Sequence, residues 1–290
     1  MAWSSPPTAT RTCRRRRPGA PPSPPPRRRD RHRRGGHRPM TLKDKVAIVT
    51  GGSQGIGEAI CRAYAREGAK VAVVNARKPA LGQSVARTIQ EAGGTARAFP
   101  CDVSRREQVR KLVEDVTGAW GTVDILVSNA GIMINKAVEE YTEEDWDLTV
   151  DTNLKGAFLM AQAVIPLMKA KRSGKIVFMA SIAATHAFPN SVPYCASKAG
   201  VWMMSKALCA ELAKSGINVN SISPGNTATP LNEHLQRDPE FVRLMQSYTP
   251  TGRAYLSTDE VAGAAVFLAS EDARAIHGVD LIVDDGWCAM

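Results

Sequence analysis

The chain has 290 residues, 43% of them hydrophobic, and a formal net charge of +10. This length and apolar content suffice for one substantial α/β core and require no second folded domain. The charge would suggest nucleic-acid binding, but residues 1–39 hold twelve arginines and one acid, a net of +11, which leaves −1 for residues 40–290. The folded body is therefore nearly neutral, and we expect no nucleic-acid binding from it.

Cysteine spacing and hydropathy exclude further classes. The six cysteines show neither CxxC nor Cys/His ligand spacing, so the sequence predicts no zinc site and no disulfide framework. No apolar run reaches the roughly 18 residues that a bilayer span needs, and no cleavable leader is evident. We expect a cytoplasmic protein with no metal site and no membrane contact.

Residues 1–39 differ in composition from the rest of the chain. They combine arginine runs with nine prolines and almost no aliphatic residues, so burial cannot offset the entropy of ordering them. A targeting or polyanion-binding arm is one interpretation, but the proline-rich residues 21–26 forbid the amphipathic helix of a transit peptide. We interpret residues 1–39 as a disordered, dispensable extension or the product of an upstream start, and residues 40–290 as the folded domain.

Deleting residues 1–39 should leave both the melting temperature and the turnover unchanged, because a Pro/Arg segment has little apolar surface to bury. Calorimetry and initial-rate measurements on the shortened chain would check this. A clear loss of either quantity would mean that the extension packs on the domain.

The first predicted strand leads into a glycine-rich turn. Residues 45–49 form a short β-branched run, residues 50–57 read TGGSQGIG, and apolar residues then recur at helical spacing from Ile56 to Tyr64. In such a strand–turn–helix unit, Gly51 allows the tight turn and Gly55 allows a pyrophosphate to approach the backbone. Gly57 would let the helix pack on the strand, leaving N–H groups and the helix dipole to face phosphates.

Further strand-like runs alternate with helical stretches along the rest of the chain. Together with residues 45–49 they predict a single Rossmann-like, doubly wound α/β domain with a seven-stranded parallel sheet. Ligands of such sheets bind beyond the carboxyl ends of the strands. The further runs are residues 70–74, 96–100, 125–128, 175–180, 218–223 and 281–283.

A tyrosine and a lysine lie four residues apart, as Tyr194 and Lys198, with Ser181 thirteen residues before the tyrosine. On a helix these two positions share one face, so we expect the ammonium to lower the phenol pKa from its usual value near 10. Tyr194 would then exchange a proton with a carbonyl or alcohol oxygen. Alone, this spacing occurs often by chance.

The accompanying motifs make the pattern specific. Together with Asn153, the TGxxxGIG turn, Asn129-Ala130-Gly131, residues 224–229 and residues 284–286, it resembles the short-chain dehydrogenase/reductase family from about Thr41 to the C-terminus. The resemblance implies a ketone/alcohol oxidoreductase in which Tyr194 is the proton donor and Ser181 orients the carbonyl. It also implies that Lys198 binds the nicotinamide ribose and that Asn153 holds a proton-relaying water.

The resemblance further implies a nicotinamide dinucleotide cofactor. Asp102 would contact the adenine and Thr229 the carboxamide of the nicotinamide. The full implied set of cofactor-binding residues is Gly51, Ser53, Gly55, Ile56, Gly57, Arg77, Asp102, Val103, Asn129, Gly131, Tyr194, Lys198, Pro224, Gly225, Thr227 and Thr229.

The end of the second strand favours NADP(H) over NAD(H). NAD sites carry an acid about 20 residues after the glycines, whereas a 2′-phosphate calls for a cation. This chain has Ala76 where NAD-preferring members of the family carry Asp, and Arg77 follows. Arg77 and Lys78 could also be an exposed pair at a helix start.

Residues 132–135, 182–189 and 230–255 should set substrate specificity, and the last of these has the mixed character of a mobile lid. We expect a small ketone, sugar or polyol, with 3-oxoacyl-acyl-carrier-protein reductase as the alternative and a non-catalytic NADP(H) sensor or polyanion-binding protein as another. The helices around residues 153–168 and 193–212 carry much apolar surface, and the resemblance implies that they form subunit contacts, so we expect a homotetramer.

Overall fold

A computed structural model describes residues 41–76 and 78–289 of the chain, which belong to a unit spanning Pro39–Met290. The predictions for residues 1–39 and for the side chain of Arg77 lie outside the described residues. Within them no helix is long and apolar enough to cross a bilayer. No group of three or more His, Cys, Asp or Glu side chains in this part of the chain could hold a metal ion.

Seven parallel strands form one sheet in the order β3-β2-β1-β4-β5-β6-β7. The predicted doubly wound α/β fold is confirmed, and each predicted strand is within two residues of the observed one at both ends. The strands are β1 (Val46–Thr50), β2 (Lys70–Asn75), β3 (Thr95–Pro100), β4 (Ile125–Ser128), β5 (Gly174–Met179), β6 (Ile217–Pro224) and β7 (Asp280–Val283).

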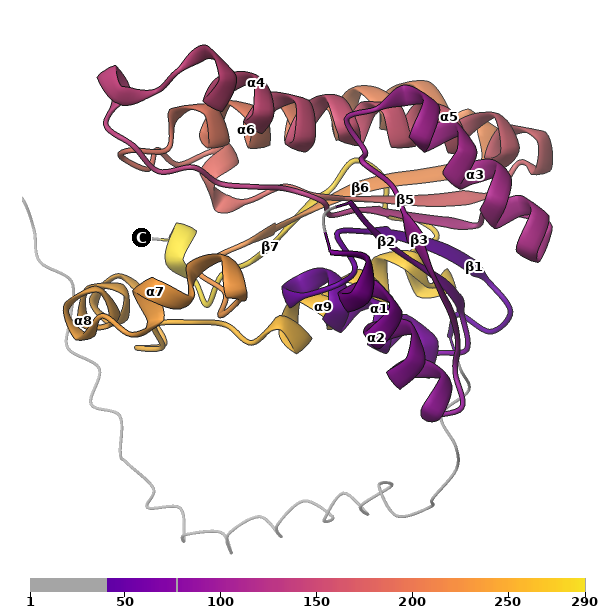
Figure 1. The fold of residues 1–290 in the computed structure, drawn as a ribbon, viewed down its shortest axis with the longest axis horizontal. Helices are drawn as coiled ribbons and strands as arrows, with labels where there is room; N and C mark the ends of the chain where they lie inside the picture. The colour runs from indigo at the N-terminus through magenta and orange to yellow at the C-terminus, as the bar shows by residue number, and fades with distance from the viewer. Residues whose placement is uncertain (1–40, 77, 290) are drawn as a thin grey trace, which may run out of the picture. The chain divides into compact units, whose positions relative to one another are not determined.

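Helices cover both faces of this sheet (Figure 1). Helices α1, α2 and α9 lie on one face, and α3, α4, α5 and α6 on the other, while the short helices α7 and α8 form the segment between β6 and α9. The helices are α1 (Gly55–Arg66), α2 (Pro79–Glu91), α3 (Arg106–Trp120), α4 (Glu143–Val150), α5 (Gly156–Lys171), α6 (Val192–Leu212), α7 (Glu233–Gln236), α8 (Pro239–Tyr248) and α9 (Thr258–Ala269).

Alternate residues of the central strands feed two separate cores. In β1, Ala47 and Val49 pack with α1, α2 and α9, whereas Val46 and Ile48 pack with α3, α5 and α6. Every residue of β1 is buried, which is why the strand reads as an unbroken apolar run. Each fully buried aliphatic side chain stabilises the fold by roughly 1.5–3 kcal/mol, so these two cores fix the sheet rigidly.

The chain reverses direction across the sheet between β1 and β4. Strands β2 and β3 follow on one side of β1, whereas β4 to β7 follow on the other. The carboxyl ends of β1 and β4 therefore part at a topological switch point, where doubly wound sheets bind their ligands. The glycine-rich turn follows β1 at this point, and Asn129 follows β4.

Candidate active site

The turn after β1 is shaped by its glycines. Gly51 and Gly55 have φ angles of +65° and +56°, a conformation that other residues rarely adopt. A β-carbon on Gly57 would lie 2.2 Å from the carbonyl oxygen of Gly51, so only glycine lets α1 start this close to β1. Gln54 precedes α1 without making a side-chain cap. The first N–H groups of α1 thus remain available to an anion, as a pyrophosphate cradle requires.

Thr50 and Asn129 tie this turn to the end of β4. The Thr50 hydroxyl accepts the backbone N–H groups of Asn129 and Ala130 at 2.9 and 3.0 Å. The Asn129 amide donates to the carbonyl oxygen of Thr50 at 2.9 Å and approaches that of Gly51 at 3.4 Å. Asn129 therefore shapes the cradle by bonding to the backbone of the glycine turn. Thr50, which is absent from the predicted site, contributes equally by bonding to the backbone after β4.

The turn after β2 is the region that would face the adenosine ribose. The buried Asn75 side chain donates to the carbonyl oxygen of Lys78 at 2.5 Å and closes the turn. A β-carbon on Gly82 would lie 2.5 Å from Asn75 Oδ1, so this amide also sets how α2 approaches the strand. Ala76 is exposed on the turn and offers no acid. Arg77 follows it in sequence but lies outside the described residues.

Asp102 and Val103 follow β3. The Asp102 carboxylate accepts the backbone N–H and the hydroxyl of Ser104 at 3.0 and 2.7 Å, so its described bonds stay within its own turn. Val103 is buried, and a β-carbon on Gly156 would lie 2.6 Å from its side chain. This places the turn against the start of α5, on the α3 and α5 side of the sheet.

Helix α6 carries the predicted acid/base pair on one face. The Lys198 ammonium lies 5.7 Å from the centroid of the Tyr194 ring and donates to the Met179 carbonyl oxygen at 2.7 Å. Ser181, just past β5, accepts the Ala183 N–H at 3.1 Å and lies beside the Tyr194 hydroxyl. The Ser181 hydroxyl accepts this bond and still has its own hydrogen to donate.

Burial sets the protonation of this pair. It raises the pKa of the Tyr194 phenol, against the opposing effect of the Ser181 hydroxyl, and it lowers the pKa of Lys198 to about 8. The expectation that Lys198 holds the tyrosine pKa below its usual value is therefore wrong for this structure. The cost of desolvating the phenolate outweighs the hydrogen bond from the Ser181 hydroxyl, which is the opposing effect. Tyr194 is protonated at neutral pH, the form that can give a proton to a carbonyl oxygen.

Asn153 lies in a turn of π-helix, η2 (Asp151–Lys155), between α4 and α5. Its Oδ1 accepts the Ile132 N–H at 2.8 Å, and its amide donates to the Ile132 carbonyl oxygen and the Ser197 hydroxyl at 2.9 and 3.0 Å. The side chain is thus committed to the loop after β4 and to α6. The water-holding role that the resemblance implies for Asn153 stays a prediction, and π-turns often mark functional sites.

The segment after β6 lies next to the glycine turn. A β-carbon on Gly55 would lie 3.4 Å from the Thr229 side chain. Asn232 organises this segment, because its Oδ1 accepts the Thr229 N–H at 3.0 Å and its amide donates to the Thr227 carbonyl oxygen at 3.0 Å. From the sequence, Asn232 is predicted only as part of the mobile lid, residues 230–255. Pro224 ends β6.

The predicted residues meet through a series of short contacts. A β-carbon on Gly131 would lie 3.3 Å from Asn153 Oδ1 and 3.6 Å from Lys198 Nζ, which joins the loop after β4 to the acid/base pair. The Thr229 side chain packs against Gly55 of the glycine turn that follows β1. Ser53 and Ile56 are half-buried in the turn and the first turn of α1. The residues present fit a dinucleotide, with the glycine cradle and Lys198 as its two ends.

Comparison with known proteins agrees with this geometry. A family model described as Enoyl-(Acyl carrier protein) reductase matches residues 51–288. D-threitol dehydrogenase of Mycolicibacterium smegmatis is 43% identical over 246 residues, covering 85% of this chain and 94% of that protein. The 3-oxoacyl-(acyl-carrier-protein) reductase of Thermotoga maritima is 36% identical over 247 residues, covering 85% and 99%.

Solved structures show the same architecture. The gluconate 5-dehydrogenase of Burkholderia cenocepacia J2315, crystallised in complex with NADP and tartrate, superposes with a TM-score of 0.83 at 34% identity. The match covers 87% of this chain and 98% of that one. With a family model spanning most of the chain and relatives above 30% identity over nearly their full length, the chain belongs to the short-chain dehydrogenase/reductase family.

Proposed function

We propose that this protein is an NADP(H)-dependent oxidoreductase that interconverts a small secondary alcohol, sugar or polyol and its ketone, with Tyr194 as the acid/base. One observation carries the proposal. The described structure brings Ser181, Tyr194 and Lys198 together, beside the loop that leads back to an uncapped glycine cradle at the switch point.

In this proposal the chain's own residues supply the proton and the hydrogen bonds of the reaction. The cofactor, held by the glycine cradle and Lys198, would supply or accept the hydride. Charge that builds up on the substrate oxygen needs hydrogen-bond donors aimed at it. In this proposal the Ser181 hydroxyl and the protonated Tyr194 phenol are those donors, and their lying side by side supports it. The Lys198 ammonium, fixed by the Met179 carbonyl, stabilises the phenolate left after proton transfer.

Small polyhydroxy compounds are the favoured substrates. The relatives named above include a dehydrogenase of D-threitol and one of gluconate, and the second was crystallised with the hydroxy acid tartrate. These names support, for this chain, a substrate with a secondary alcohol flanked by further hydroxyl groups.

The carrier-protein alternative is weakened by the surface cations of α5. Docking an acidic carrier protein would need free cations at the end of this helix, where Lys169, Lys171 and Arg172 are the candidates. Lys171 donates to the Val123 carbonyl oxygen and pairs with the Asp124 carboxylate. The Arg172 guanidinium donates to the Lys214 carbonyl oxygen at 3.0 Å, and Lys169 lies 3.5 Å from a Glu211 carboxylate oxygen. Each is engaged within its own chain.

The substrate class is tested by a panel. Purified protein would be assayed with both cofactors, following absorbance of the reduced nicotinamide, against four-carbon polyols, sugar acids, simple ketones and a 3-oxoacyl thioester. The proposal expects the highest kcat/KM with a polyol or its ketone and NADP(H). Preference for the thioester would transfer the assignment to the carrier-protein pathway, and activity with none would favour a binding protein.

For cofactor choice, Arg77→Ala should weaken NADPH binding about 10- to 150-fold and leave NADH binding nearly unchanged. The reason is that a charge-assisted hydrogen bond to the 2′-phosphate contributes ~1.5–3 kcal/mol. Ala76 is exposed on the same turn, so Ala76→Asp should repel the phosphate and shift preference toward NADH. Titration of each cofactor against each variant gives the dissociation constants.

Lys78→Ala is the matched control for the Arg77 experiment, because Lys78 is an exposed cation one residue further along the chain. It should change the two affinities equally and little. A wild-type preference for NADH, or an equal loss of both affinities in Arg77→Ala, would contradict the NADP assignment.

We also propose that the protein is a cytoplasmic homo-oligomer, most simply a tetramer. Large apolar side chains are exposed on neighbouring helices, with Trp146 of α4, Phe158 of α5 and Met203 of α6 at 43%, 42% and 53%. Apolar surface that gathers in this way commonly marks an interface. The five described cysteines are all unpaired, as a reducing compartment would leave them. Light scattering gives the mass that tests the assembly.

A further inference from the structure

The last residues of the chain return to the edge of the sheet that carries the candidate site. Strands β5, β6 and β7 are parallel neighbours, so the segments that follow them leave the sheet side by side. Ser181 follows β5, Gly225 follows β6 and Asp284 follows β7. A β-carbon on Gly225 would lie 2.8 Å from the β-carbon of Asp284, so the last two segments touch where they leave the sheet.

Residues 284–289, which we call the C-terminal hook, are anchored on one side to the chain between α8 and α9. The Asp284 carboxylate accepts the N–H groups of Gly286 and Cys288 at 2.9 and 2.7 Å. The Asp285 carboxylate receives two bonds from the Arg253 guanidinium at 2.7 and 2.8 Å, the bidentate geometry that fixes orientation as well as distance. The hook is thus held by its own turn and by Arg253.

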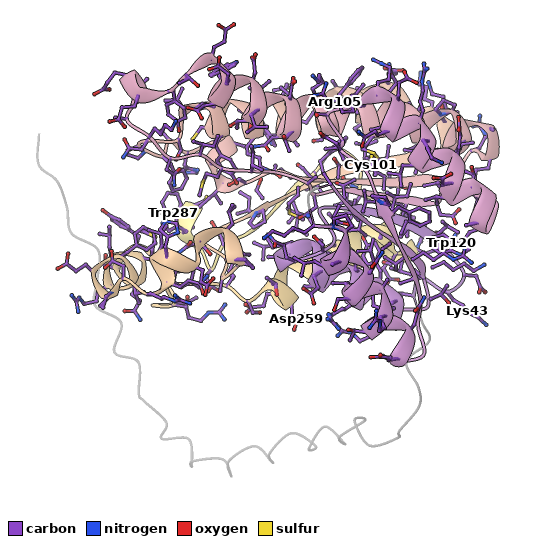
Figure 2. The ribbon with its side chains drawn as sticks, viewed as in Figure 1. Lys43, Cys101, Arg105, Trp120, Asp259 and Trp287 are labelled. Atoms are coloured by element: carbon purple, nitrogen blue, oxygen red, sulfur yellow. The ribbon has the colours of Figure 1, made fainter. Side chains whose placement is uncertain are left out.

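The other side of the C-terminal hook packs on the loop after Ser181. The Trp287 ring stacks on Phe188 with centroids 5.5 Å apart, and it meets His186 edge-on at 5.3 Å. Figure 2 shows Trp287 between the α7–α8 segment and the helices on the far side of the sheet. Residues 182–191 join Ser181 to the helix of Tyr194, so the indole contacts the loop that connects the two polar groups of the site.

We propose that Trp287 is a specificity-determining residue, whose indole forms the wall of the substrate pocket on the side of the C-terminal hook. The inference rests on the proposed function. It assigns the pocket to alcohols and ketones with short, unbranched chains, because the indole limits the room for a bulky or cyclic group on the reacting carbon. The ring is half-buried, and it cannot swing away without breaking its contacts with His186 and Phe188. The bonds from Arg253 to Asp285 fix the segment from which the ring extends.

The size of the effect follows from general pocket energetics. A single methylene in an apolar pocket changes discrimination about 10- to 200-fold, and an indole is far larger than a methylene. Removing the ring should therefore relax discrimination by at least about tenfold. The cofactor cradle lies on residues 50–57 and has no described contact with Trp287, so cofactor affinity should stay unchanged.

The test compares wild type with Trp287→Ala, using a four-carbon hydroxyketone and a bulky cyclic ketone as paired substrates. The ratio of kcat/KM for the bulky ketone to that for the small one should rise at least about tenfold, mainly through a lower KM for the bulky ketone. The dissociation constant of NADPH, measured by fluorescence titration, should stay within twofold of wild type.

Trp120→Ala is the matched control. Trp120 is also a half-buried tryptophan in an edge-to-face pair, with Phe99 at 6.0 Å, and it lies at the opposite end of the domain in Figure 2. It should leave the substrate ratio within twofold while lowering the melting temperature. If Trp287→Ala does not fold, Phe188→Ala removes the ring on which Trp287 stacks and should shift the ratio in the same direction.

Failure of the Trp287 assignment and failure of the proposed function give different results. The assignment of Trp287 is overturned if folded Trp287→Ala reduces the small ketone with an unchanged ratio of the two kcat/KM values. If only Phe188→Ala folds, the same result in that variant overturns it. Either result leaves the proposed function intact. A wild-type protein that binds NADPH but reduces ketones of neither size rejects the proposed function, and the specificity assignment with it.

Discussion

Tyr194→Phe is expected to lower turnover by about 10²- to 10⁴-fold, the usual contribution of general acid–base catalysis. The change removes the hydroxyl beside Ser181 and keeps the ring that lies 5.7 Å from the Lys198 ammonium. Packing and cofactor affinity should therefore stay close to those of wild type. Steady-state rates with the best substrate of the panel, together with an NADPH titration, measure the two properties separately.

Tyr64→Phe provides the matched control for this variant. The Tyr64 hydroxyl is buried between α1 and α9 and donates to the Ala265 carbonyl oxygen at 2.9 Å. Ala265 lies inside α9, so its carbonyl oxygen keeps its helical bond, and the loss of the hydroxyl should cost about 0.5–1.5 kcal/mol of stability with little change in turnover. The two variants thus make the same chemical change with opposite consequences. Turnover of Tyr194→Phe within threefold of wild type would reject the mechanism.

Lys198→Met is expected to abolish most activity and yet to stabilise the protein near neutral pH. Burial lowers the Lys198 pKa from its ordinary 10.5 to about 8, so the folded state carries its charge at a cost of about 3 kcal/mol. Methionine removes that cost, although the Met179 carbonyl loses its donor at a cost of about 1 kcal/mol. The net gain at pH 7 should be about 2 kcal/mol.

The gain should reverse with pH. Below pH 8 Lys198 is charged in both the folded and the unfolded chain, and wild type bears the full cost. Between about 8 and 10.5 the unfolded chain binds more protons, so wild-type stability rises with pH. Above 10.5 both forms are neutral and only the lost hydrogen bond remains. Urea unfolding from pH 7 to 10 should show the advantage of Lys198→Met shrinking steadily.

Lys206→Met is the control for removing a lysine from α6. Lys206 is exposed and lies 4.5 Å from the Trp202 ring centroid, so its loss should change stability by at most about 1 kcal/mol. A pH-independent difference between Lys198→Met and wild type would show that Lys198 is not desolvated in the folded protein.

The sheet was predictable because its central strands are buried on both faces. Residues 45–49 and 125–128 read as continuous apolar runs, and their observed counterparts, β1 and β4, begin and end within one residue of the prediction. The placement of Tyr194 and Lys198 on one helix face was also expected, from their four-residue spacing together with the accompanying motifs. A local sequence pattern is enough to predict a feature when a single helix, strand or turn contains all of its residues.

Features that depend on distant parts of the chain were not predictable. The sequence gives no sign that Asn153 lies in a π-turn bonded to Ile132, because that turn is set by packing between α4 and α6. The upward shift of the Tyr194 pKa depends on burial by residues that are remote in sequence, and spacing indicates only the nearby charge. The contacts of Trp287 with His186 span about a hundred positions.

The bonds between Thr50 and Asn129 also bear on how the protein is made. They join residues 79 positions apart in sequence, so the glycine turn cannot take its final form until β4 has paired with β1. Such long-range closure is slow relative to local folding. During synthesis, β1, β2 and β3 would emerge from the ribosome well before β4. Dinucleotide binding would then require that at least the residues up to Asn129 have left the ribosome, which makes NADPH affinity a reporter of the pairing of β4 with β1 in chains of increasing length.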